Sequence, residues 1–370
     1  MVYDEEKIVS ALKAFERGEI VVVTDDDDRE NEGDLTVAAV HCTEEKMAFI
    51  IRHTTGIVCA PMPKEEAQRF HLAPMVPDNN SAHQTQFTVT VDFKHGITTG
   101  ISAHDRTLAV RNLANPNAGA HDFIRPGHIF PLIAHEGGVL MRSGHTEAAV
   151  DLCKLAGLPP VGVIGELVND DGSVKHGDEV TKFAQEHRLH MITVADLIAY
   201  RQRKEMLIRH VGEMAIETPV GPAIVQSYQL PWETVQHVAI VFGDLGDGED
   251  IPVRLHRENI MNDVFGQASD VTAIMQRMME KEKRGVFVYL REGSVGIDEK
   301  SAMSIQEMAK DGSENHIQAI EREEEWRQIG LGSQILKHLG ISSVIVYTSK
   351  ERHYLDLEGF GIRISRIDIL

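Results

Sequence analysis

Two apolar segments enclose an acidic run in the stretch Ile20-Val21-Val22-Val23-Thr24-Asp25-Asp26-Asp27-Asp28-Arg29-Glu30-Asn31-Glu32-Gly33-Asp34-Leu35-Thr36-Val37-Ala38-Ala39-Val40. The apolar segments have the composition of β-strands, and Gly33 fits a tight connection between them. Alternate side chains of an extended chain share a face. The pattern therefore predicts that four carboxylates point into the same space: Asp28, Glu30, Glu32 and Asp34. Crowded carboxylates bind protons more strongly unless a cation lies among them. A solvated acidic turn is the competing interpretation, and an EF-hand fits poorly because Ala39 holds its twelfth position.

The composition indicates a globular protein with room for two or three domains, since the chain has 370 residues, 42% of them hydrophobic and 25% charged. The net charge of −20 disfavours nucleic acids and anionic membranes as partners. A membrane-spanning run and a signal-peptide pattern are both missing from the sequence, so we expect a cytoplasmic protein. The three cysteines are too few and too scattered for a disulfide framework.

Several helices and strands are predicted around the acidic stretch. Residues 4–17 and 43–53 have helical spacing of apolar side chains. A short buried strand ends near Cys59. Cys59 is a candidate pocket residue, and the alternative is a core residue, which is the commoner role of a cysteine in such a place. Gln86–Asp92 alternates as a half-buried strand, and Thr99 lies in a polar segment before a helix expected from Asp105, where an anion could bind.

A second informative stretch is Arg125-Pro126-Gly127-His128, followed by residues 137–148. A strand predicted at Val139–Met141 turns through Ser143 and Gly144 into a helix. Arg142, the turn amides and Thr146 would then meet at a helix N-terminus, which suits a phosphate. His145 is a candidate metal ligand there, and a cap or surface role is the alternative.

Glu166 lies in the apolar, glycine-flanked segment Val161–Val168. An isolated buried carboxylate is costly, so this side chain is expected to be neutral, paired or near a cation.

Taken together, Asp28–Asp34, Arg125–His128, Arg142–Ala148 and Gly165–Leu167 resemble 3,4-dihydroxy-2-butanone 4-phosphate synthase, a riboflavin-pathway enzyme. The resemblance covers roughly residues 4–203, and the chain departs from the family pattern at Ser81–Gln86 and at His135-Glu136.

The resemblance implies conversion of ribulose 5-phosphate to 3,4-dihydroxy-2-butanone 4-phosphate and formate, with magnesium or manganese, in a homodimer that shares active sites. By position, Glu30 and His145 match the metal ligands. Arg29 and Asp34 match substrate contacts, and Arg142, Ser143, Gly144, His145 and Thr146 match the phosphate-binding turn. His128 and Glu166 match residues needed for catalysis, and either Glu32 or Asp34 is the proposed proton-moving partner.

The second half becomes β-rich after a charged segment, which predicts domains at residues 1–204 and 205–370, both with α/β layers. Four motifs there resemble GTP cyclohydrolase II: Val253–His256, Asn262–Gly266, Gly285–Gly293 and Gly332–Leu336. The family's three zinc cysteines are replaced by Asn259, Asp270 and Thr272, which are unsuited to a thiolate-rich zinc site. Further positions depart at Ser294, Glu325 and Ile329, although Arg327 remains.

The resulting prediction is a synthase with a degenerate second domain that holds no zinc and is inactive as a cyclohydrolase. A bifunctional synthase and cyclohydrolase is one alternative. A non-catalytic scaffold or regulatory protein is the other.

Overall fold

The structure is a computed structural model that describes residues 4–25, 31–81, 85–259, 263–264, 270–291, 329–348, 357 and 360–369. It forms two compact units that divide between Tyr200 and Arg201, whereas the sequence predicted a boundary at 204/205. No helix within these ranges is both long enough and apolar enough to cross a membrane.

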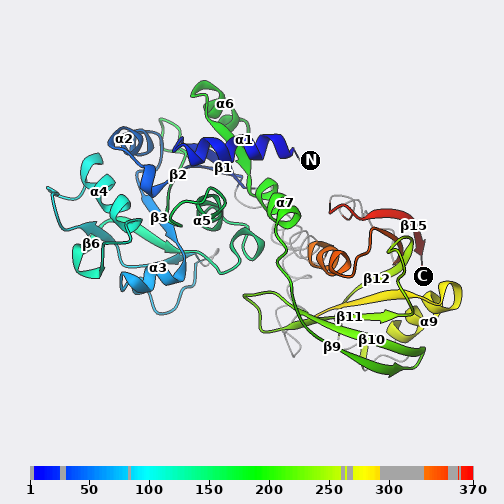
Figure 1. The fold of residues 1–370 in the computed structure, drawn as a ribbon. Helices are drawn as coiled ribbons and strands as arrows, with labels where there is room; N and C mark the ends of the chain where they lie inside the picture. Colours follow the sequence, from blue (N-terminus) through cyan, green and yellow to red (C-terminus); the bar gives the residue numbers. More distant parts are fainter. Residues whose placement is uncertain are drawn as a thin grey trace. The chain divides into compact units, whose positions relative to one another are not determined.

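The first unit is built on a mixed sheet with the strand order β4-β6-β3-β7-β2-β1-β8, and β5 pairs with β6 (Figure 1). Its strands are β1 (Val21–Thr24), β2 (Gly33–Ala38), β3 (Val58–Met62), β4 (Gln86–Phe87), β5 (Val91–Phe93), β6 (Phe123–Ile133), β7 (Gly162–Glu166) and β8 (His190–Thr193).

Helices cover both faces of this sheet. They are α1 (Glu5–Glu16), α2 (Glu44–His53), α3 (Lys64–Arg69), α4 (Ala103–Leu113), α5 (His145–Leu155), α6 (Asp178–Glu186) and α7 (Val194–Lys204), with short 3-10 turns η1 (Ala39–His41), η2 (Ala120–Asp122) and η3 (Gly138–Leu140). One face packs against Ile50 of α2, Leu113 of α4 and Val180 of α6. The other packs against Phe15 of α1 and Leu152 of α5, so the sheet is the middle of three layers.

Three helices begin after a residue whose side chain caps the first turn. Asp4, Thr43 and Ser102 each accept a hydrogen bond from a backbone N–H in the first turn of α1, α2 and α4. The predicted helices at 4–17 and 43–53 are therefore confirmed, with α1 and α2 in their places.

Two predicted strands are wrong. Gln86–Asp92 is divided into β4 and β5, because Thr88 between them bonds the carbonyl of Pro131 with both its N–H and its hydroxyl. Pro131 has no N–H to return, which interrupts the ladder. Val139–Met141 contains the 3-10 turn η3 instead of a strand, and the Val139 N–H donates to the Asp151 carboxylate at 2.8 Å.

The acidic stretch is less regular than predicted. Asn31 has φ 55°, so the chain leaves the extended conformation there and the single alternating face from Asp28 to Asp34 is wrong. Residues 26–30 lie outside the described residues. Gly33 belongs to β2 and pairs with Thr24; a Cβ at position 33 would lie 2.4 Å from Cγ1 of Val180. Close packing against α6, and not a tight turn, therefore requires this glycine.

The second unit has a seven-stranded sheet with the order β15-β14-β12-β13-β11-β10-β9. Its strands are β9 (Arg209–Thr218), β10 (Gly221–Gln229), β11 (Gln236–Phe242), β12 (Ile251–Arg257), β13 (Gly285–Leu290), β14 (Ser343–Thr348) and β15 (Arg363–Ile369). Helix α9 (Asp270–Glu282) packs through Met278 on one core, and a helical segment over residues 329–338 packs through Ile335 on another. The predicted α/β class is thus confirmed for both units.

Candidate functional site

Strand register brings three predicted site residues to one face of the first sheet. Cys59 of β3 lies opposite Ile164 of β7, and Glu166 lies opposite Asp34 of β2. Residues two apart in a strand share a face, so Cys59, Glu166 and Asp34 point to the same side. Cys59 and Ile164 pack there against Ala149 of α5, so the three residues share the face that this helix covers.

The two acids of this face have different surroundings. Asp34 is 2% exposed, whereas Glu166 is exposed at the end of β7. The expectation of a buried Glu166 is therefore wrong, because the strand ends before its side chain is covered. Burial, followed by the negative charges of Asp34 and Glu166, raises the pKa of the Cys59 thiol. Cys59 is consequently a neutral residue beneath the two carboxylates.

His128 of β6 is held by a buried acid. Its ring Nδ1 lies 2.8 Å from Oδ2 of Asp92, and its backbone N–H donates to Oδ1 of Asp92 at 2.8 Å. Asp92 is only 5% exposed. A carboxylate beside Nδ1 favours the tautomer with a proton on that nitrogen, which leaves Nε2 able to accept or return a proton.

The loop that contains Thr99 is fixed by Asp105 at the start of α4. The Asp105 carboxylate accepts hydrogen bonds from the Thr98 hydroxyl at 2.7 Å and from the Gly100 N–H at 3.0 Å. Burial would raise the pKa of Asp105, but hydrogen bonds from Thr98 and Gly100 outweigh it and lower the pKa to about 2. Thr99 itself is exposed between these two anchors.

The predicted phosphate turn leads into α5, with Gly144 as the N-cap. Nη1 of Arg142 donates to Oε2 of Glu147 at 2.6 Å, and Nη2 donates to the Thr85 hydroxyl at 2.9 Å. Glu147 is completely buried and also accepts the His135 N–H at 3.0 Å. Part of the Arg142 charge is therefore balanced within the protein, and the guanidinium is held in one position.

Helix α5 presents its first backbone amides at this turn. The first N–H groups of a helix have no acceptor within the helix, and its dipole favours an anion. His145 and Thr146 occupy the first turn and are 8% and 5% exposed, while Ser143 precedes the cap and is half-buried. This arrangement suits the predicted phosphate contact.

The predicted metal site is only partly described. Arg29 and Glu30 lie outside the described residues, and among the residues that are described no three His, Cys, Asp or Glu side chains are gathered closely enough to hold a metal. The candidates that are described offer an imidazole nitrogen and carboxylate oxygens; they are His145, Asp34, Glu32 and Glu166. This donor chemistry fits magnesium or manganese. The Glu32 N–H donates to Asp25 at 3.0 Å, which ties down the end of the acidic stretch.

The second unit has a hydrogen-bonded network that includes Asn259, one of the three positions matched to the family's zinc cysteines. Asp263 accepts the Asn259 N–H at 2.8 Å and the Tyr289 hydroxyl at 2.7 Å, and it lies 3.0 Å from Nε2 of His256. Asp270 begins α9 and Thr272 follows it in the same helix. These residues supply no thiolate, so the donor set does not fit a structural or catalytic zinc of that kind. Ser294, Glu325 and Arg327 lie outside the described residues, and Ile329 is buried in the core.

Three positioning acids were missed in the sequence: Asp92, Asp105 and Glu147. Asp92 ends the predicted strand, Asp105 starts a predicted helix and Glu147 lies inside the Arg142–Ala148 motif. Their partners are distant in sequence or lie across a turn. The only signal was the presence of an acid next to a motif.

Comparisons with known proteins agree on both halves of the chain. The family profile described as 3,4-dihydroxy-2-butanone 4-phosphate synthase matches residues 9–200, and that of GTP cyclohydrolase II matches residues 209–367.

Two relatives come from Arabidopsis thaliana. The chloroplastic bifunctional riboflavin biosynthesis protein RIBA 1 is 43% identical over 98% of this chain and 69% of its own length. The chloroplastic monofunctional protein RIBA 2 is 44% identical over 97% of this chain and 75% of its own length.

Two solved structures are similar. RibBX from A. baumannii, described as a two domain 3,4-dihydroxy-2-butanone 4-phosphate synthase, has a TM-score of 0.82 at 30% identity and covers 98% of this chain and 99% of its own. A 3,4-dihydroxy-2-butanone 4-phosphate synthase in complex with two magnesium ions has a TM-score of 0.52 at 46% identity and covers 53% of this chain and 97% of its own.

Proposed function

This chain belongs to the 3,4-dihydroxy-2-butanone 4-phosphate synthase family, with a GTP cyclohydrolase II domain that follows the synthase domain in the sequence, and we propose that it converts ribulose 5-phosphate to 3,4-dihydroxy-2-butanone 4-phosphate and formate. The observation that carries the proposal is the shared face of the first sheet, where Asp34 and Glu166 lie side by side in register. The N-terminus of α5, in the same unit, would supply the anion site.

The phosphate of the substrate would bind at the start of α5. The backbone amides at His145 and Thr146 and the guanidinium of Arg142 are donors that suit a phosphate. Because Glu147 and Thr85 already hold the guanidinium, little side-chain freedom is lost when the ligand binds. Tight positioning of the phosphate orients the sugar carbons for the chemical steps.

Proton transfer would fall to Asp34, Glu166 and His128. Formation of an enediol from a ketose removes a proton from carbon and delivers one to oxygen. Asp34 is a buried carboxylate close to the exposed Glu166, and His128 has one nitrogen fixed by Asp92 and the other available. Glu32 remains a candidate for the same role as Asp34.

Magnesium or manganese would be held by Glu30 and His145 and would stabilise negative charge on the substrate oxygens. The similar synthase structure with two magnesium ions supports this metal class. The residues of this chain would then orient the substrate and move its protons.

The second domain is the point at which the comparisons and the residues differ. The cyclohydrolase profile and the bifunctional relative fit a bifunctional enzyme better than a monofunctional synthase, so that is the second candidate function. We propose the monofunctional form because Asn259, Asp270 and Thr272 replace the zinc cysteines that the family resemblance requires. Two similar proteins support this choice. RIBA 2 is named as monofunctional, and RibBX is described as a two domain synthase.

We also propose that the protein acts in the cytoplasm on a small sugar phosphate, as a homodimer and without nucleic acid or membrane partners. The support is the −20 net charge and the family resemblance. Sedimentation of the purified chain would test the dimer, and a monomer at all concentrations would contradict it.

Formate release tests the synthase assignment. The wild type with ribulose 5-phosphate and magnesium is compared with the Glu30→Ala and His145→Ala variants. We expect activity only in the wild type; equal activity in all three proteins would overturn the site. In a parallel assay with GTP and zinc we expect no formate or pyrophosphate, and turnover there would establish the bifunctional alternative.

A further inference from the structure

Gly100 is the one buried residue of an exposed loop that precedes α4. The two residues before it and the two after it are exposed, whereas Gly100 itself is buried. An added Cβ at this position would overlap Oδ2 of Asp92 and lie 2.6 Å from Nδ1 of His128. These are the two atoms that lie 2.8 Å apart in the Asp92–His128 hydrogen bond. The backbone at Gly100 therefore lies directly against that bond.

The backbone conformation of Gly100 also requires a glycine. Its φ is 88°, in the left-handed region that residues with a Cβ rarely adopt. The position thus has two independent reasons to be a glycine, a strained conformation and the lack of room for a side chain. The loop uses its main chain as the packing surface against the Asp92–His128 bond.

The loop covers the carboxylate end of this bond more than the imidazole end. Only 7% of the Asp92 side chain is exposed, against 38% of the His128 side chain. Water that reached the carboxylate would compete for its lone pairs, and a hydrogen bond shielded from water is stronger. The cover therefore favours the tautomer of His128 that keeps its proton on Nδ1 and leaves Nε2 for proton transfer.

Asp105 holds the loop in this position. Its carboxylate is 1% exposed and accepts three hydrogen bonds from the loop. Oδ2 accepts the Thr98 hydroxyl at 2.7 Å and the Gly100 N–H at 3.0 Å, and Oδ1 accepts the Thr98 N–H at 3.1 Å. Hydrogen bonds to a charged acceptor are stronger than neutral ones, so a movement of the loop away from His128 would break strong bonds.

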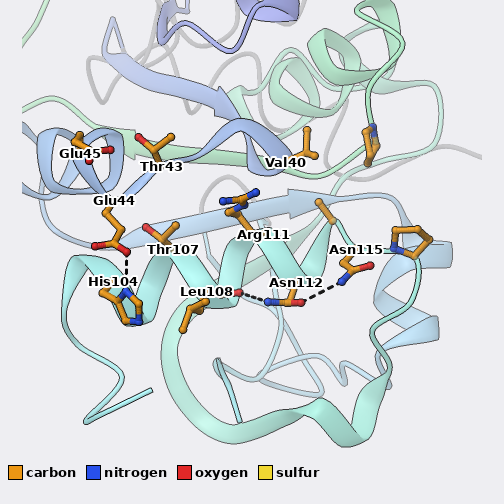
Figure 2. Close-up of a pocket in the computed structure, with 13 residues that line it drawn as sticks. Val40, Thr43, Glu44, Glu45, His104, Thr107, Leu108, Arg111, Asn112 and Asn115 are labelled. Atoms are coloured by element: carbon orange, nitrogen blue, oxygen red, sulfur yellow. Dashed lines mark hydrogen bonds and ion pairs between the residues drawn. The ribbon is translucent and has the colours of Figure 1, made fainter. Parts of the chain in front are cut away.

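The start of α4 gives Asp105 a defined place. The Asp105 N–H donates to the Ser102 hydroxyl at 3.1 Å, which caps the helix. Nδ1 of His104 lies 2.7 Å from Oε1 of Glu44, so the first turn of α4 also contacts the start of α2 (Figure 2). The carboxylate that holds the loop is thus fixed by its own helix and by a neighbouring one.

Arg106 connects the same helix turn to Asp92. Its side chain is buried, and Nη1 donates to the Gly56 carbonyl at 2.8 Å. Burial lowers the pKa of Arg106, and the negative charge of Asp92 opposes this shift. Asp92 therefore interacts with a cation of α4 as well as with His128.

We propose that Gly100 and Asp105 are positioning residues for His128: Asp105 holds the loop over the Asp92–His128 bond, and Gly100 shields that bond from water. The inference rests on the proposed function only for the role of His128 as a proton carrier. The shielding itself concerns the tautomer of His128, which can be measured without turnover.

Long-range proton–nitrogen NMR of the full chain with labelled histidine tests the proposal, because the two ring nitrogens give different signals in the two tautomers. The signals of His128 are those that His128→Gln removes. At about pH 8, above the ordinary pKa of histidine, we expect the Nδ1–H tautomer in the wild type. In Gly100→Ala and in Asp105→Asn we expect a mixture with the Nε2–H tautomer.

Gly96→Ala is the matched control for Gly100→Ala. Gly96 has φ 75°, so an alanine there meets the same kind of backbone strain. An added Cβ would make only an ordinary contact, 3.7 Å from Leu108. This variant should keep the wild-type tautomer of His128.

Asp171→Asn is the control for Asp105→Asn, because Asp171 also accepts a backbone N–H and a hydroxyl, both from Ser173. It should behave like the wild type. Thr98→Val is the milder variant of the loop itself. It removes one donor to Asp105 at an exposed residue, so it keeps the test open if Asp105→Asn does not fold, and it should shift the tautomer in the same direction.

Kinetics with ribulose 5-phosphate gives a second readout. General acid–base catalysis contributes about 10²–10⁴-fold, so a partly misplaced His128 should lower kcat by about tenfold in Gly100→Ala and Asp105→Asn. An unchanged tautomer in every folded loop variant would overturn the proposal, as would a rise in KM alone, which would point to Thr99 and the substrate instead. An inactive wild type with the expected tautomers would contradict the proposed function and support the shielding.

Discussion

Replacement of Gly144 by alanine should damage the phosphate turn without altering the backbone. Gly144 has φ −109° and ψ 157°, a conformation that alanine adopts without strain. An added Cβ would lie 2.4 Å from Nη1 of Arg142 and 2.7 Å from Oε2 of Glu147. Both distances are too short for a Cβ contact, so the guanidinium and the carboxylate must move from their present positions.

The cost to stability arises because Arg142 balances the charge of a buried carboxylate. Glu147 is completely buried, and displacing its cation should cost about 1–3 kcal/mol of stability. If Arg142 also loses its place at the phosphate, the loss of a charged hydrogen bond worth about 1.5–3 kcal/mol should lower kcat/KM by about 10- to 100-fold.

Steady-state kinetics with ribulose 5-phosphate and denaturant unfolding measure the two effects. Gly212→Ala is the control, because Gly212 has open space around the added methyl group in β9. It should leave the kinetics unchanged. A Gly144→Ala variant with the wild-type KM and kcat would refute the assignment of Arg142 to the phosphate.

Three further predictions concern groups whose surroundings are described. Asp92→Asn should lower kcat/KM by about 10- to 100-fold with the fold intact, because His128 loses a charged partner worth about 1.5–3 kcal/mol; a wild-type pH–rate profile would refute this. The Cys59 thiol should resist iodoacetamide at pH 8 until the protein is unfolded, since burial raises its pKa; rapid labelling of the native protein would contradict the burial. Burial, with a smaller effect of Arg291, lowers the pKa of His237 to about 4. Its folded pKa is below the ordinary value near 6.5, so the second unit should lose up to about 3 kcal/mol of stability as pH falls from about 6.5 to 4. His237→Gln should flatten that pH dependence, and an unchanged slope would refute it.

Local patterns predicted much of the fold. The spacing of Ile8, Leu12 and Phe15 and the cap at Thr43 gave α1 and α2 with nearly correct bounds, because helix periodicity and capping are local properties. The α/β class followed from alternating strands and helices. Domain identity came from long motifs and the resemblance they carry.

What the sequence did not predict depends on distant partners. Gly33 is required by Val180 of α6, which follows it by more than a hundred residues, and the exposure of Glu166 depends on where β7 ends. The Asp92–His128 and Arg142–Thr85 contacts likewise join separate strands and loops. Tertiary packing, which no local pattern encodes, fixes these features.

The most direct test of the account is the stoichiometry of formate and 3,4-dihydroxy-2-butanone 4-phosphate released from ribulose 5-phosphate by the purified full chain with magnesium. The account predicts equal amounts of both products from the wild type, and neither product from an Asp34→Asn, His145→Ala double variant that unfolds at the wild-type temperature. A folded wild-type protein that releases neither product, or a double variant that releases both at the wild-type rate, would contradict it.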